Sequence, residues 1–194
     1  MMAQLQQEKD RLNLAPKKFN MWIFIFASFM FFAALTSAFI VYSGSKGHAL
    51  SIILPKAFMY STAVLIASSV TLFFASKAAK QLQLARQRLL LAITMGLGMV
   101  FFIIQIYAWY ILTYKMGIYF TDPNASRTFV FVMSGMHLLH IIGGLIFLGA
   151  ALAGSIKRIP QVKNIYRMEM ASIFWHFLDI IWIYLYVFLL LNQY

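Results

Sequence analysis

Residues 170–191 read MASIFWHFLDIIWIYLYVFLLL. This run is apolar apart from a few polar side chains, and it contains neither lysine nor arginine. A helix needs roughly 20 consecutive apolar residues to cross the hydrocarbon layer of a membrane. Apolar and polar residues do not alternate along the run, which argues against a strand of a membrane β-barrel. The stretch therefore predicts a transmembrane helix, whose backbone satisfies its own hydrogen bonds.

Four similar runs precede it, and the links between consecutive runs are short. Short links favour consecutive antiparallel helices in one bundle. We therefore expect an all-α integral membrane bundle of five transmembrane helices, which forms a single domain over residues 20–194 behind a polar leader at 1–19. The expected helices lie at about 20–42, 57–76, 89–114, 128–156 and 170–191.

The composition agrees with a membrane protein. Hydrophobic residues make up 62% of the chain and charged residues only 11%, whereas soluble domains carry about 25% charged residues. The net charge is +11, but the basic residues lie between the apolar runs, so they indicate membrane orientation better than nucleic-acid binding. The absence of cysteine excludes disulfides, thiolate metal sites and cysteine nucleophiles.

The basic residues predict the orientation. Twelve of them fall in the leader and in the second and fourth links, which lie on one side of the membrane in an antiparallel bundle. They are Lys9, Arg11, Lys17, Lys18, Lys77, Lys80, Arg86, Arg88, Lys157, Arg158, Lys163 and Arg167. Because cytoplasmic loops carry an excess of lysine and arginine, we expect a cytoplasmic N-terminus and a periplasmic C-terminus.

A few ionisable side chains fall within or beside the last span. Glu169, Ser172, His176 and Asp179 follow one another at intervals of three, four and three residues, which places all four on one helix face. Ionisable groups cost roughly 2.5–3.5 kcal/mol at the centre of a bilayer, so this face should turn toward the interior of the bundle.

The fourth span carries His137 and His140, which are three residues apart and share a face. The simplest packing brings one of these histidines against His176 or Asp179 of the last span. Three interpretations remain open on the residues alone. The group is a structural polar cluster, a site for a lipid phosphate or a proton relay, or a metal or heme site.

Several segments together resemble one family. FWHFLDIIW at 174–182, with Glu169 seven residues before the histidine, is similar to the Tyr-Trp-His-Phe-Val-Asp-x-Val-Trp signature of subunit III of heme-copper oxidases. GMHLLHIIG at 135–143 resembles that subunit's Gly-Phe-His-x-x-His-Val-x-x-Gly stretch. KFNMW at 18–22 and QIYAW at 105–109 are similar to its Lys-Phe-Gly-Met-Trp and Gln-x-x-Glu-Trp segments. The last two helices carry the specific part of the resemblance.

The resemblance implies a short, five-helix bacterial form of a cytochrome c oxidase subunit 3 in the inner membrane. Such a subunit is not itself catalytic and carries no heme or copper, which belong to partner subunits. It packs against catalytic subunit I, holds phospholipid, and supports the stability and proton uptake of a complex that reduces dioxygen and pumps protons.

The resemblance also predicts the site and two departures from the family. Ser28 and Ala108 stand where the family has glutamates, which suggests that the two lost carboxylates formed one polar pocket. The expected polar cluster, with both tryptophans packed around it, comprises His137, His140, Glu169, Trp175, His176, Asp179 and Trp182.

Other functions compete with this interpretation. The equivalent subunit of a quinol oxidase, or a nitric oxide reductase accessory protein, would share the same helix signatures. An independent b-heme membrane protein would use His137 and His176 as its two ligands. A transporter is disfavoured because the first three spans lack interior charges and broken segments.

Overall fold

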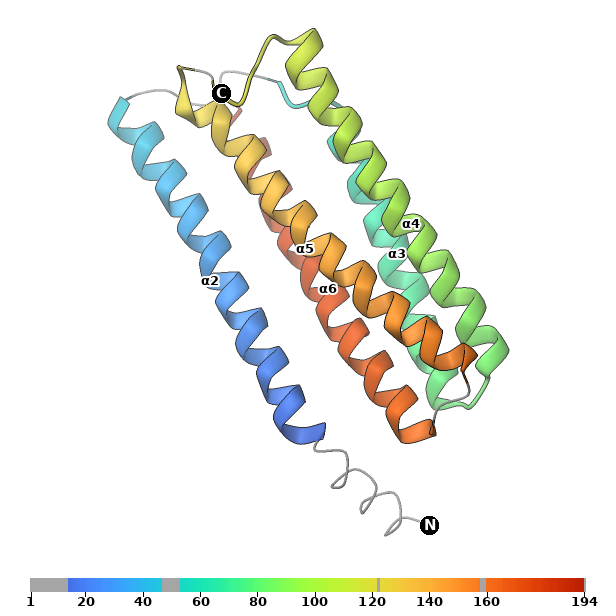
Figure 1. The fold of residues 1–194 in the computed structure, drawn as a ribbon. Helices are drawn as coiled ribbons and strands as arrows, with labels where there is room; N and C mark the ends of the chain where they lie inside the picture. Colours follow the sequence, from blue (N-terminus) through green and yellow to red (C-terminus); the bar gives the residue numbers. More distant parts are fainter. Residues whose placement is uncertain (1–13, 47–52, 122, 158–159, 194) are drawn as a thin grey trace.

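The computed structural model describes residues 14–46, 53–121, 123–157 and 160–193, and within them the chain is built of helices (Figure 1). All five long helices are long and apolar enough to cross a membrane, which confirms the predicted all-α, five-span architecture. In chain order the elements are α2 (Leu14–Lys46), α3 (Ala57–Lys80), α4 (Leu84–Tyr110), the π-helical turn η1 (Ile111–Lys115), α5 (Ala125–Ile156) and α6 (Gln161–Leu191).

Most helices extend beyond the predicted spans. Helix α6 begins at Gln161, directly after Pro160, so Lys163 and Arg167 are helical and not part of a link. Helix α2 begins at Leu14 and takes in the end of the predicted leader, while residues 1–13 lie outside the described residues. Hydropathy marks the part of a helix that lies in hydrocarbon, whereas the helix itself continues into the polar boundary of the membrane.

The helices pack in a particular order. Helix α3 packs along α4, α5 lies against α4 and α6, and α6 also contacts α3. Helix α2 contacts only α5 and α6 among the described helices. Figure 1 shows the result, with α2 on one side of the α5–α6 pair and α3 with α4 on the other. Helix α4 reaches α6 through side chains, as in the hydrogen bonds between Gln87 and Asn164. Helix α6 is therefore the element that every other long helix described here contacts.

Polar contacts fasten one end of the bundle. Arg88 of α4 donates from Nε and Nη2 to the carbonyl of Ser155 near the end of α5, at 3.1 and 2.6 Å. Gln161 donates to the carbonyl of Ala79 at 3.1 Å. These bonds show that the α3–α4 and α5–α6 connections lie at the same end of the bundle, as an antiparallel order requires. We call this end the fastened end.

Candidate functional site

His140 lies between α5 and α2. Its Nδ1 is 2.8 Å from the carbonyl oxygen of Met136, one turn earlier, so this nitrogen carries the proton that is donated. In the neutral imidazole Nε2 then accepts, and the hydroxyl of Ser28 on α2 lies 3.3 Å from it. The ring also packs against Phe32, with 5.2 Å between ring centroids. His140 thus fastens α2 to the bundle through one polar and one aromatic contact.

His137 lies in a box of aromatic rings. Its side chain is fully buried, and its centroid is 4.9 Å from that of Trp182, 5.8 Å from Phe101 and 6.4 Å from Phe32. Neither ring nitrogen has a hydrogen-bond partner among the described residues. The imidazole therefore acts here as a flat packing element between α2, α4 and α6.

His176 faces α3 with one of its nitrogens. Nδ1 is 2.7 Å from the hydroxyl of Ser69 and 3.7 Å from Oδ2 of Asp179, which is too long for a hydrogen bond. Serine and carboxylate approach the same nitrogen, so the three residues cannot act as a Ser–His–Asp relay, which needs them on different nitrogens. The Nε2 atom makes no hydrogen bond to a described residue, and 35% of the side chain is exposed.

The side chains expected to form one polar cluster are divided among separate contacts. Glu169 pairs with Lys18 of α2 across 3.2 Å at the fastened end of the bundle. No hydrogen bond or ion pair joins His137 or His140 to His176 or Asp179 in the part of the chain that the structure describes. This corrects the expectation of a single cluster. Regular spacing placed the residues on helix faces but did not show toward which neighbour each face turns.

The two tryptophans of α6 fasten it to α3. Nε1 of Trp175 donates to the hydroxyl of Ser68 across 3.0 Å, and Nε1 of Trp182 donates to the hydroxyl of Thr62, also across 3.0 Å. Trp175 is fully buried. A hydroxyl partner is what a buried indole N–H requires. The sequence contained a pattern that could have predicted these bonds. Trp175 and Trp182 are seven residues apart on one helix, and the hydroxyl residues Ser68 and Thr62 are six apart on another.

Ser28 and Ala108 are the two positions where the resemblance implies that glutamates were lost. Ser28 meets His140. Ala108 is fully buried, and its neighbour Trp109 donates to Ser134, six residues before His140 on α5. Six residues of helix correspond to roughly 9 Å along the axis. That carboxylates at these two positions would form one pocket stays a prediction.

The histidines do not fit a bis-histidine heme site. His137 packs against Trp182 of α6. Trp182 and His176 are six residues apart on α6, so their side chains leave the helix in directions that differ by roughly 120°. The two imidazoles consequently do not face a common gap. Over the described ranges, no group of three or more His, Cys, Asp or Glu residues converges in a way that could hold a metal ion.

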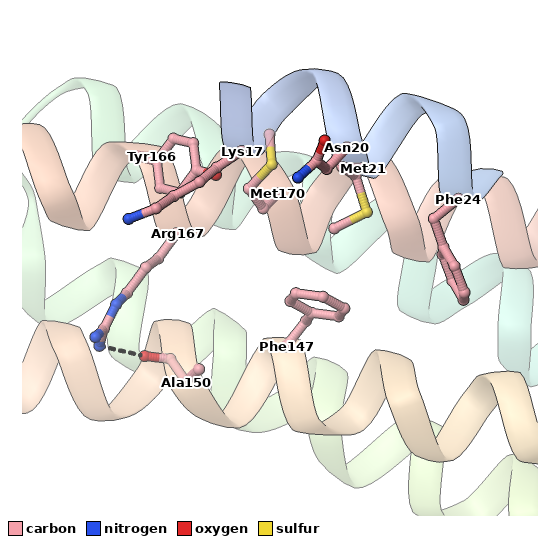
Figure 2. A pocket seen from close by; sticks show the side chains of 9 residues that line it. All are labelled: Lys17, Asn20, Met21, Phe24, Phe147, Ala150, Tyr166, Arg167 and Met170. Carbon is pink, nitrogen blue, oxygen red and sulfur yellow. Dashed lines mark hydrogen bonds between the residues drawn. The ribbon is translucent and has the colours of Figure 1, made fainter. Parts of the chain in front are cut away.

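A cavity of about 520 Å³ opens between α2, α5 and α6 at the fastened end (Figure 2). Its wall includes the apolar side chains of Met21, Phe24 and Phe147, and its rim carries Lys17 and Arg167. Arg167 also donates to the carbonyl of Ala150 across 3.2 Å, which holds the guanidinium beside the opening. In the sequence, both cations indicated only the orientation of the chain, and no pattern of residues marked the cavity.

The family model of cytochrome c oxidase subunit III matches residues 12–193, which include all five of the membrane-spanning helices among the described residues. A cytochrome bo(3) ubiquinol oxidase subunit 3 from Buchnera aphidicola is 30% identical over 94% of this chain and 90% of its own length.

Two further relatives carry the cytochrome c oxidase name. A cytochrome c oxidase subunit 3 from Bacillus subtilis is 25% identical over 92% of this chain and 87% of its own length. One from Petromyzon marinus is 32% identical over 66% of this chain, but only 48% of that protein is matched. A match over nearly the whole chain, on a five-span helical bundle, shows that the chain belongs to the cytochrome c oxidase subunit III family of heme-copper oxidases.

Proposed function

We propose that this chain is the non-catalytic subunit III of a respiratory terminal oxidase that reduces dioxygen and pumps protons. The observation that carries the proposal is the family match over residues 12–193. The geometry supports it, because the histidines, tryptophans and arginine described above are engaged in contacts between helices. Heme and copper would then reside in partner subunits, foremost the catalytic subunit I.

The proposed location is a bacterial inner membrane, with the fastened end of the bundle in the cytoplasm. Cytoplasmic ends of membrane helices carry an excess of lysine and arginine. Lys77, Lys80, Arg88 and Arg167 lie at or near this end of their helices. The hydrogen bonds from Gln161 to Ala79 and from Arg88 to Ser155 lie there as well. The relatives from Buchnera aphidicola and Bacillus subtilis support a bacterial subunit.

The cavity between α2, α5 and α6 is the proposed phospholipid site. Lys17 and Arg167 would pair with the phosphate, because a phosphate at the membrane boundary favours basic side chains there. Below them, Met21, Phe24 and Phe147 would contact the first part of an acyl chain. A lipid held in this place would fill the space between α2 and the α5–α6 pair.

We propose that the subunit keeps the catalytic partner stable and its proton uptake working through many turnovers. The electron donor is cytochrome c or a quinol. Both kinds of oxidase are represented among the relatives, by name. The chain itself contributes packing surface in either case.

The test is the lifetime of the oxidase with and without this chain. With the chain removed, the complex should start at a similar rate of dioxygen consumption but lose activity after fewer turnovers. An equally long-lived complex, or one that is inactive from the first turnover, would contradict the proposed role.

The lipid site has its own test. Reversing the charge in Lys17→Glu should lower the phospholipid that co-purifies with the complex, measured as phosphorus per heme. Lys80→Glu changes an exposed cation at the same end that does not line the cavity, and it should leave that ratio unchanged. Equal ratios in the two variants would contradict the assignment of the cavity.

A further inference from the structure

One face of α6 remains open in this chain, and it carries a polar side chain within the hydrocarbon layer. Glu169, Ser172, His176, Ile180 and Ile183 recur at intervals of three or four residues and so lie along one line on the helix. We call these five residues the α6 strip. Ile180 is 67% exposed, Ile183 is 39% exposed, and His176 is partly exposed.

The neighbouring helices leave the strip uncovered beyond Glu169, which pairs with Lys18 of α2. Helix α3 holds one side of α6 through the bonds from Trp175 and Trp182. Helix α2 holds another side, where Thr36 and Tyr184 share a hydrogen bond of 2.8 Å. Helices α2 and α3 do not contact each other. The strip therefore lies on the part of the α6 surface between them.

His176 lies inside the hydrocarbon layer. Arg167 and Glu169 of α6 lie beside the membrane boundary, and His176 is seven residues beyond Glu169, or roughly 10 Å deeper along the helix. The hydrocarbon layer is about 30 Å thick, so this depth is about two thirds of the way to its centre. Lipid headgroups do not reach a side chain at that depth.

The imidazole has an unused hydrogen-bonding atom that points away from its own partners. Ser69 and Asp179 both lie on the Nδ1 side of the ring. The carboxylate of Asp179, 3.7 Å from Nδ1, favours the proton on that nitrogen, which leaves Nε2 as an acceptor. One turn earlier, the hydroxyl of Ser172 is partly exposed and makes no hydrogen bond to another described residue.

An ionisable side chain at the centre of a span normally faces the inside of a bundle, because an unpaired one in lipid costs several kcal/mol. Helix–helix contacts in membranes are strengthened by polar side chains that bond across the interface. The rest of the strip is apolar, and exposed Ile66 and Phe73 of α3 border it near Ser69. The surface thus has the composition of a helix interface with one polar contact at its middle.

We propose that the α6 strip is the docking face for a transmembrane helix from a neighbouring oxidase subunit, and that this helix donates a hydrogen bond to Nε2 of His176. The donor is a hydroxyl, amide, indole or basic side chain at the depth of His176. The inference rests on the proposed function, since it needs a complex in which such a partner exists. It goes beyond that function by naming the docking face and the chemistry of its contact.

Photocrosslinking in the intact complex tests the docking face. A benzophenone side chain at Ile180 should crosslink to another oxidase subunit. The matched control is Ile103, which is 64% exposed on α4 and lies away from the strip; it should give a weaker crosslink or none. The proposal would be overturned if position 180 crosslinked only to lipid or to a second copy of this chain. It would also be overturned if only position 103 crosslinked to another oxidase subunit. If no oxidase subunit co-purifies with any variant, the proposed function fails instead.

Two substitutions test the hydrogen bond. The side-chain amide that His176→Asn introduces reaches about as far as Nδ1 of the histidine did, so it can keep the contact with Ser69. The amide that His176→Gln introduces reaches about as far as Nε2 did, so it can keep the contact with the partner helix. We expect the asparagine variant to lose this subunit during detergent washing several times faster than the glutamine variant, while both isolated chains remain equally stable. Equal retention of the two variants, or a loss that follows the stability of the isolated chain, would contradict the proposed contact.

Discussion

The slot that holds Trp175 gives the sharpest prediction of stability. A Cβ added at Gly98 of α4 would lie 2.7 Å from Cη2 of Trp175 and 3.0 Å from Cδ2 of Leu145. Favourable carbon contacts lie at about 3.5–4.0 Å, so the ring would have to retreat by about 1 Å. It cannot retreat toward α5, because a Cβ at Gly144 would itself be only 2.9 Å from Cε3 of the same ring. The tryptophan is wedged between two glycines.

The clash in Gly98→Ala should therefore cost about 1–3 kcal/mol, the usual cost of overpacking a core, before the gain in helix propensity is counted. Gly96→Ala is the matched control, since it lies on the same helix and has nothing within 4 Å of the added carbon. Both substitutions change helix propensity by the same amount, about 1 kcal/mol in favour of alanine, so their difference isolates the clash. The measurement is reversible unfolding in mixed micelles with increasing SDS, followed by far-ultraviolet circular dichroism.

A double-mutant cycle identifies the ring as the cause. Trp175→Phe removes Cη2, so in that background the excess cost of Gly98→Ala over Gly96→Ala should fall to less than about 1 kcal/mol. The reasoning is refuted if the two glycine variants unfold at the same fraction of SDS. It is also refuted if the excess cost is unchanged when the indole is absent.

Three further predictions use the same unfolding assay. His137→Leu removes two buried nitrogens that lack hydrogen bonds. It should leave stability nearly unchanged, because removing a desolvation penalty of roughly 1–3 kcal/mol offsets the lost ring contacts. A marked loss of stability would show that the imidazole makes a hydrogen bond. Arg88→Gln should cost about 1.5–3 kcal/mol, because it removes charge-assisted bonds to the Ser155 carbonyl; an unchanged midpoint would count against that contact. Lys18→Ala removes an exposed pair with Glu169 and should cost less than about 1 kcal/mol, so a larger loss would show that the pair is shielded.

The sequence predicted the membrane spans well because hydropathy is a property of each segment by itself. The five apolar runs correspond to α2 through α6. The helix ends were less accessible, as the start of α6 shows. Lys163, Arg167 and Glu169 lower the hydropathy of its first turns, yet these residues are helical beside the membrane boundary.

The partners of the polar residues could not be predicted because they depend on how each helix is rotated within the bundle. His137 and His140 are three residues apart, but one enters an aromatic box and the other meets Ser28 of α2. His176 was expected to turn inward and instead lies beside Ser69 with one nitrogen unused. The resemblance identified the family, whereas the position of each contact came from the packing.

The central claim is that this chain is a scaffold subunit of a heme-copper oxidase. The heme content of the chain, measured within the complex and after separation from it, tests this claim most directly. The tagged chain would be purified in mild detergent with its partners, then separated from them in a stronger detergent, and optical spectra would be recorded at both stages. The account predicts heme absorption and copper in the complex and neither in the separated, folded chain. A Soret band that stays with the separated chain, or a tagged chain that brings no oxidase subunit with it, would contradict the account.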